Sequence, residues 1–241
     1  MHAVAARHWR GVIPHFRGCS GTPNLLPRAY HSGDSEEISW ILHRLHTHAA
    51  PSPLYAAGVS LGGNTLLKWL GENTHDARTL TTCAAAVCPP LDLTLCGHAL
   101  GQGFNRIYTR HFLSTLKQKA LLKLERYPGL FDPVHLQQSR TLFEFDNIYT
   151  APVHGYRDAR DYWQRASSKP LLHAIRTPTL LLLSRNDSFI PPAAYPTSPE
   201  CSAFIHLEIP AQGGHAGFTA ASGPGYGWLP QQLLTYFIDN S

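Results

Sequence analysis

The chain has 241 residues, of which 43% are hydrophobic and only 15% are charged, so it is long enough for one domain with a sizeable core and too apolar to be disordered. The net charge is only +4 at pH 7, and the basic residues are dispersed, which argues against a nucleic-acid-binding protein; the densest basic stretch, residues 106–126, is typical of the solvated face of a helix. No apolar run is long enough to span a membrane, so no integral membrane segment is expected.

The beginning of the chain alternates between helix and strand patterns. Residues 1–10 are typical of the end of a helix, and residues 11–16 predict a strand, although Pro14 is unusual inside one. After a loop, Asp34 and Ser35 are both suitable N-caps for a helix whose apolar residues recur at helical spacing.

Two short apolar strands are predicted next, over residues 54–59 and 82–88, with a helix over residues 64–70 between them. Strands that alternate with helices are typical of a parallel sheet whose faces the helices cover. We therefore expect an α/β fold with a mostly parallel sheet.

The turn between the first of these strands and its helix has the form G-x-S-x-G. Gly58 and Gly62 lack the Cβ atoms that we expect to collide across so tight a turn. Ser60 should then stand exposed at the carboxyl end of a strand, with the Leu61 N–H directed at whatever the serine attacks, as an oxyanion donor. The pentapeptide alone is as typical of an ordinary strand-to-helix turn.

The alternation stops at residue 89, and the pattern is helical with almost no strand up to about residue 175. An insert of this size between two strands is most simply a helical cap that covers the serine and lines an acyl pocket. The alternative is a packed helical subdomain that does not touch substrate. We expect one domain, with residues 1–88 and 176–241 forming the two parts of the core and residues 89–175 forming the cap.

An acid and a histidine follow the two strands that come after the insert. Asp187 follows the predicted strand over residues 179–184, and His215 follows the one over residues 204–209. Nucleophile, acid and histidine in the order Ser60, Asp187, His215 are the arrangement of the α/β hydrolases. The three together predict a serine-hydrolase site.

Each of these residues has another interpretation when taken alone. Asp187 is also suitable as a turn residue or helix cap, and His215 as a loop histidine that binds backbone. Asp158 and Asp161 are competing carboxylates, but they lie in the helical pattern of the insert and do not follow a strand.

Cysteine and histidine usage indicates neither a disulfide framework nor a metal site. The five cysteines are odd in number and include no C-x-x-C pair, so a reducing compartment, and with it a cytoplasmic location, is the simpler expectation. The 15 histidines show no H-E-x-x-H or comparable ligand spacing.

Five short motifs, taken together, resemble the YheT-like branch of the α/β hydrolases, bacterial relatives of the mammalian ABHD1/ABHD3-type hydrolases. The motifs are His15-Phe-Arg-Gly-Cys-Ser-Gly21, Tyr30-His-Ser-Gly33, Gly58-Val-Ser-Leu-Gly-Gly-Asn64, His154-Gly-Tyr156 and Gly213-Gly-His215. The similarity runs from about Met1 to the C-terminus.

The resemblance implies a serine carboxylesterase that acts on short-chain acyl esters or monoacylglycerols through an acyl-enzyme and without a cofactor. Its partner would be a small ester or lipid-like substrate, and the oligomeric state stays open. Ser60 matches the nucleophile, Asp187 the acid and His215 the base. His15, Arg17 and His31 match motif positions without an assigned role, and Arg17 is as suitable for pinning its loop by hydrogen bonds.

Members of that family carry a longer segment before the position that matches Met1. It supplies the first strands and a His-Gly loop with the second oxyanion N–H, so the resemblance implies that these N-terminal strands are missing here, with a gap between the strands over residues 11–16 and 54–59. Losing one oxyanion donor typically costs about 10²–10³ in rate. A truncated, catalytically weak or inert remnant therefore stays open as an alternative, as does an acyltransferase that uses the same triad.

Overall fold

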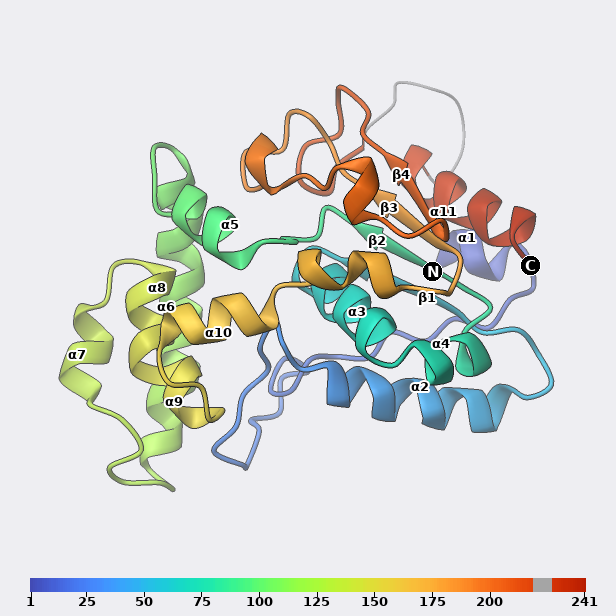
Figure 1. Ribbon diagram of the computed structural model, residues 1–241. Helices are drawn as coiled ribbons and strands as arrows, with labels where there is room; N and C mark the ends of the chain where they lie inside the picture. Colours follow the sequence, from blue (N-terminus) through green and yellow to red (C-terminus); the bar gives the residue numbers. More distant parts are fainter. Residues whose placement is uncertain (219–226) are drawn as a thin grey trace.

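A computed structural model describes residues 1–218 and 227–241, and in these residues four parallel strands form one sheet in the order β1-β2-β3-β4 (Figure 1). The strands are β1 (Tyr55–Val59), β2 (Cys83–Val87), β3 (Thr179–Leu182) and β4 (Ile205–Glu208). Every residue of β2 and β3 is buried, as expected for central strands of a parallel sheet that is covered on both faces. The predicted α/β-hydrolase fold with a parallel sheet is confirmed.

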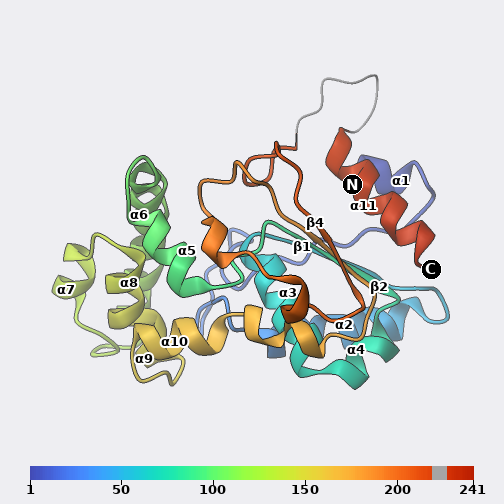
Figure 2. The same cartoon turned by 45° about the horizontal axis from the view of Figure 1, so that its top comes forward.

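Helices cover the two faces of this sheet. α3 packs directly on β1 and β2, with α2 and α4 beside it, whereas α11 and α1 lie together on the opposite face (Figures 1 and 2). Their bounds are α1 (His2–Ala5), α2 (Ser35–Ala49), α3 (Leu61–Glu72), α4 (Thr74–Leu80) and α11 (Trp228–Asp239). The core lies between these layers, where Leu67, Trp69 and Leu70 of α3 are fully buried.

The chain between β2 and β3 is helical in the structure, and most of it forms a group of helices to one side of the sheet, whereas residues 169–174 at its end pack on α3 (Figure 1). Two small apolar clusters of its own hold this group together. The elements are α5 (Leu93–Leu100), α6 (Asn105–Leu124), α7 (Pro133–Gln138), α8 (Leu142–Phe145), the π-helical turn η1 (Asp146–Thr150), α9 (Ala151–Val153), α10 (Ala159–Ala166) and the 3₁₀ turn η2 (Lys169–Ala174). Two further 3₁₀ turns, η3 (Pro192–Ala194) and η4 (Ser198–Glu200), lie between β3 and β4.

The strand predicted over residues 11–16 is wrong. This segment is extended but pairs with no strand among the described residues, and Val12 and Ile13 are 55% and 63% exposed. A strand exists only through its ladder of hydrogen bonds to a neighbour, and Pro14 has no N–H to contribute to one. β1 is therefore an edge strand of the described sheet, and the predicted gap between two strands at this position does not occur.

Among the described residues, no helix combines the length and the apolar character that crossing a bilayer requires. The same part of the chain contains no cluster of three or more His, Cys, Asp or Glu side chains arranged to hold a metal ion.

Candidate active site

Ser60 lies in the sharp turn that joins β1 to α3. Its backbone has φ 53° and ψ −124°, a left-handed conformation that is strained for a residue with a side chain. The Ser60 N–H donates to the carbonyl oxygen of Val87 at 2.8 Å, which fixes the turn beside the carboxyl end of β2. The serine therefore stands where the predicted nucleophile elbow puts it, at the carboxyl edge of the sheet.

Only one of the two outer glycines of this turn is needed to avoid a steric clash. A Cβ on Gly58 would lie 2.4 Å from the carbonyl oxygen of Gly62 and 2.7 Å from the nitrogen of Gly63. A Cβ on Gly62 would meet only the ring of Phe16, at 3.7 Å, which is an ordinary contact. The expectation that both glycines avoid a collision is thus right for Gly58 and wrong for Gly62, because the Gly62 Cβ position faces the Phe16 ring and meets no backbone of the turn.

The two glycines provide a matched pair of substitutions. We expect Gly58→Ala to destabilise the fold by about 1–3 kcal/mol, because rigid backbone must move to admit the methyl group. Gly62→Ala, in the first turn of α3, should be neutral or slightly stabilising, because alanine favours a helix over glycine. Urea unfolding of both variants measures the difference, and equal stabilities of the two would contradict this account of the turn.

The structure brings the three sequence-predicted site residues together. Nε2 of His215 lies 2.7 Å from Oγ of Ser60, and Nδ1 lies 2.8 Å from Oδ2 of Asp187. The Asp187 side chain is buried, and its Oδ1 accepts the backbone N–H of Phe189 at 2.9 Å. A carboxylate fixed in this way holds a proton on Nδ1 and leaves Nε2 free to accept one from the serine hydroxyl.

Two residues that the sequence did not single out hold this arrangement in place. Oδ1 of Asn186 accepts the Gly214 N–H at 2.8 Å and the Ser184 hydroxyl at 2.6 Å, so it ties the loop of the acid to the loop of the histidine. The ring of Phe189 packs against the His215 ring, with 4.6 Å between centroids. Adjacency to Asp187 is the only sequence signal for Asn186, and no periodicity marks Phe189.

A cavity of about 850 Å³ opens in front of the serine. Ser60, Leu61 and His215 line one part of it, and apolar side chains from the helices between β2 and β3 line much of the rest. These include Leu93, Leu100, Phe112, Leu116 and Phe145. Leu61 is the first residue of α3, so its N–H has no acceptor within that helix and is free to bind an anionic oxygen at the serine.

Comparisons with known proteins identify the family and the fold of the chain. A family model described as "alpha/beta hydrolase fold" matches residues 1–219. The chain belongs to the α/β-hydrolase family. Its fold is similar to that of the putative non-heme bromoperoxidase BpoC from Mycobacterium tuberculosis, with a TM-score of 0.52 and 13% identity over all of this chain and 85% of that one, which shows the fold alone.

Curated relatives of this α/β hydrolase confirm the resemblance inferred from the motifs. The chain is 38% identical to the putative esterase YheT of Escherichia coli, over 90% of this chain and 64% of YheT. It is 28% identical to human phospholipase ABHD3 over 99% of this chain and 58% of that protein, and 27% identical to a monoacylglycerol lipase of Saccharomyces cerevisiae over 90% and 50%. The chain thus spans between half and two thirds of the length of these relatives.

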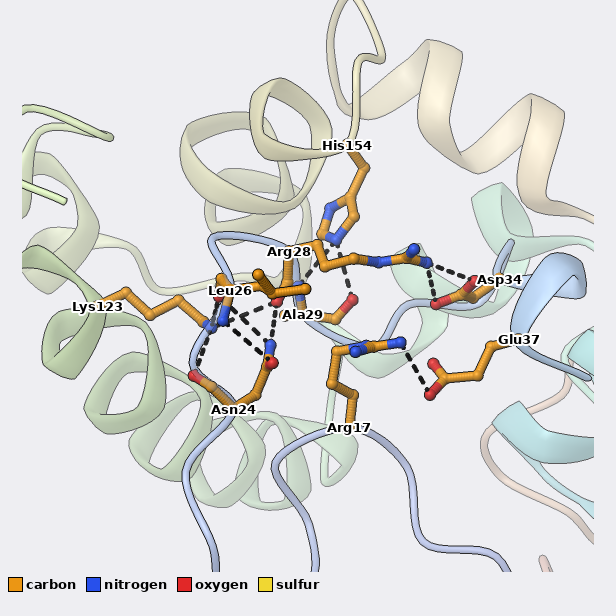
Figure 3. A network of polar contacts seen from close by, with 9 residues as sticks. All are labelled: Arg17, Asn24, Leu26, Arg28, Ala29, Asp34, Glu37, Lys123 and His154. Carbon is orange, nitrogen blue, oxygen red and sulfur yellow. Dashed lines mark hydrogen bonds and ion pairs between the residues drawn. The ribbon is translucent and has the colours of Figure 1, made fainter. Parts of the chain in front are cut away.

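The family-motif residue Arg17 belongs to a polar network around the loop that precedes α2 (Figure 3). Arg17 pairs with Glu37 of α2 at 3.2 Å, and Arg28 pairs with Asp34 at 2.8 Å. Asp34 occupies the N-cap position of α2, but its side chain binds Arg28 and makes no capping bond. These ion pairs attach the loop to the start of α2. The contact of Arg17 with Glu37 therefore favours the alternative in which Arg17 holds its loop in place.

Two side chains from the helical insert of this α/β hydrolase bind the backbone of the same loop (Figure 3). Nζ of Lys123 on α6 donates to the carbonyl oxygen of Leu26 at 2.6 Å, and the Ala29 N–H donates to Nε2 of His154 at 3.0 Å. Arg17 also lines the cavity, whereas His15 is exposed and outside its lining. The loop is therefore held between the sheet-side helices and the insert.

The third unassigned motif residue, His31, is buried, with 8% of its surface exposed. Its ring centroid lies 4.3 Å from that of His154, and its Nδ1 accepts the Gly33 N–H at 3.1 Å. Burial, reinforced by the neighbouring His154, lowers the pKa of His31 from 6.5 to about 4. The unfolded chain therefore takes up this proton first as the pH falls, so the stability linked to His31 is present above about pH 6.5 and is lost toward about pH 4.

We expect His31→Asn to reduce the acid sensitivity of the fold, because asparagine keeps an acceptor for the Gly33 N–H but does not titrate. Between about pH 7.5 and about pH 5, the wild-type chain should lose about 2 kcal/mol more unfolding free energy than the variant. Urea unfolding at the two pH values measures this, with His48→Asn as the exposed-histidine control. The same pH dependence in wild type and His31→Asn would contradict the assignment.

Proposed function

We propose that this chain is a serine esterase in which Ser60 attacks the carbonyl carbon of a short-chain acyl ester or monoacylglycerol. The observation that carries the proposal is the 2.7 Å contact between Nε2 of His215 and Oγ of Ser60, at the wall of a largely apolar cavity. A hydroxyl that shares its proton with an oriented imidazole is an activated nucleophile, and an apolar cavity suits an acyl chain.

In the first half of the proposed reaction, His215 accepts the Ser60 proton as the hydroxyl oxygen bonds to the ester carbonyl. Asp187 stabilises the imidazolium that forms and keeps it in the useful orientation. The Leu61 N–H binds the developing oxyanion. His215 then gives its proton to the departing alcohol, which leaves the acyl group on Ser60.

In the second half, His215 takes a proton from water as the water oxygen bonds to the acyl carbonyl carbon. His215 then gives this proton to Oγ of Ser60 as the bond between Oγ and the acyl carbon breaks, which releases the carboxylic acid and restores Ser60. The chemistry uses only side chains and backbone of this chain and a water molecule. We propose that α5 to η2 act as a cap, since side chains of α5, α6, α8 and η1 line the cavity at the serine.

Relatives support the class of substrate that we propose. Two of the curated proteins that the chain resembles are named as a phospholipase and a monoacylglycerol lipase, and the most identical of those described above is named as a putative esterase. All three names describe enzymes that act on esters, and two of them refer to lipids. We therefore include esters of lipid-like alcohols in the proposed substrate class.

The test is a product analysis with p-nitrophenyl esters of increasing acyl length and with monoacylglycerols, in the presence and absence of a glycerol or short alcohol acceptor. We expect free carboxylic acid to be the main product under all conditions. A new ester of the added alcohol as the main product would contradict hydrolysis and indicate acyl transfer. No turnover of any of these esters by a folded chain would contradict the proposed substrate class.

A further inference from the structure

The first half of α6 presents an apolar face to solvent. Phe104, Ile107 and Tyr108 are 87%, 63% and 50% exposed. Phe104 is the N-cap residue of α6 and has helical dihedral angles. Residues three and four positions apart lie on the same side of a helix, so these three form one stripe that is turned away from the buried residues of α6, among them Thr109 and Leu113. Three large apolar side chains so exposed on one helical stripe indicate a surface that binds something.

Positive charge accompanies this stripe. No acidic residue occurs between Asp92 and Glu125, and α6 carries five basic residues, namely Arg106, Arg110, Lys117, Lys119 and Lys123. The Nζ atoms of Lys117 and Lys123 donate hydrogen bonds to backbone carbonyl oxygens. Arg106 and Arg110 are exposed and form no ion pair with an acidic side chain in residues 1–218 or 227–241. With about 3.6 residues per turn, Arg110 lies beside Ile107 at one edge of the apolar stripe, whereas Arg106 lies farther round the helix, toward the side of Leu113. The stripe is therefore bordered on one edge by a cation without a counterion.

The stripe is connected to the candidate active site. The ring of Tyr108 packs edge-on against Phe189, with 4.9 Å between centroids, and Phe189 packs against His215. Phe112 and Leu116, on the inner side of the same helix, line the cavity at Ser60. A surface bound to the outer side of α6 would thus lie one helix thickness from the proposed acyl pocket.

We propose that the outer face of α6, defined by Phe104, Ile107 and Arg110, docks on an anionic lipid surface. Large apolar side chains beside an unpaired arginine, on a helix without acidic residues, match the boundary between acyl chains and negative headgroups, where the apolar groups enter the lipid and the cation meets phosphate. The charge complementarity favours a lipid surface over a neutral apolar partner. The group of helices that contains α6 stands to one side of the sheet, where a flat surface has access to it (Figures 1 and 2).

The test is flotation of the 241-residue chain with vesicles of phosphatidylcholine alone and with added phosphatidylglycerol. The measurement uses Ser60→Ala protein, so docking does not depend on the proposed hydrolysis and the two proposals fail separately. We expect binding to the anionic vesicles that weakens as salt is added. Phe104→Ser with Ile107→Ser, and separately Arg110→Glu, should each weaken binding by at least about tenfold.

The matched control is another exposed aromatic and arginine pair, on α2. Trp40 is 65% exposed, with the Arg44 guanidinium over its ring, and Trp40→Ser with Arg44→Glu should leave vesicle binding unchanged. Circular dichroism confirms folding of every variant, and turnover of a water-soluble ester should be unaffected in these variants made in the chain that retains Ser60.

Three results would overturn the proposal. These are equal binding to neutral and anionic vesicles, equal loss in the α2 control and in the α6 variants, and no vesicle binding at all. A self-associated chain that becomes monomeric in the Phe104→Ser, Ile107→Ser variant and binds no vesicles would assign this face to a second copy of the chain.

Discussion

Replacing Ser60 by alanine is expected to lower ester turnover by about 10⁴-fold or more while leaving the fold unchanged. The variant loses the oxygen that forms the acyl-enzyme, so only the weak acceleration from binding and oxyanion stabilisation is left. The Ser60 hydroxyl lies at the wall of the cavity. Among the described residues its side-chain hydrogen bond is to His215, so the fold should not depend on it.

The measurement is kcat/KM for a soluble ester, with circular dichroism to confirm that the variant is folded. Ser114→Ala is the control, because Ser114 is an exposed serine of α6 outside the cavity lining. Full turnover by folded Ser60→Ala protein would rule out this serine as the nucleophile.

Asp187→Asn is expected to lower turnover by about 10⁴-fold, although the side chain keeps its size. An asparagine that donates its amide N–H toward Nδ1 of His215 favours the tautomer with the proton on Nε2. That nitrogen then has no lone pair with which to accept the Ser60 proton. The effect should fall mainly on kcat, because Asp187 is not in the cavity lining.

Asp161→Asn is the matched control for this prediction. Asp161 is a second carboxylate that the sequence brings into consideration, but in the structure it binds the Arg157 N–H and Arg165 on α10. Its replacement should change kcat by less than about twofold. A similar loss in both variants would show that the assay reports general stability and not the orientation of His215.

Local patterns explain why much of the site was predictable from the sequence. The turn at Ser60 is encoded by residues within a few positions of one another. A Cβ on Gly58 would lie 2.4 Å from the Gly62 carbonyl oxygen, so the glycine at this position is a direct sequence signal for the turn. Asp187 and His215 could be placed because each follows an apolar strand, and the carboxyl ends of neighbouring parallel strands meet at one edge of the sheet.

Features that depend on partners far away in the chain were not predictable in the same way. The segment over residues 11–16 has the composition of a strand, but strand formation needs a neighbour that its own sequence does not specify. The clamp made by Asn186 depends on Gly214 in another loop, and the packing of Phe189 depends on both His215 and α6. Such contacts have no short-range signature.

The unassigned motif residues are a related case. The sequence showed that Arg17 and His31 lie in motifs, but their contacts with Glu37 and His154 join segments that are distant in the chain. The contact of Arg17 with α2 and that of His31 with the insert followed only from the three-dimensional arrangement.

The central claim is that Ser60 is chemically activated by His215 in this chain, and covalent labelling tests it most directly. The purified 241-residue chain is treated with a fluorophosphonate, its intact mass is measured, and the labelled peptide is mapped, beside Ser60→Ala and with circular dichroism on both. We predict one adduct per chain, on Ser60, and none on the variant. A folded chain that takes up no label, or that is labelled equally in the Ser60→Ala variant, would contradict the claim.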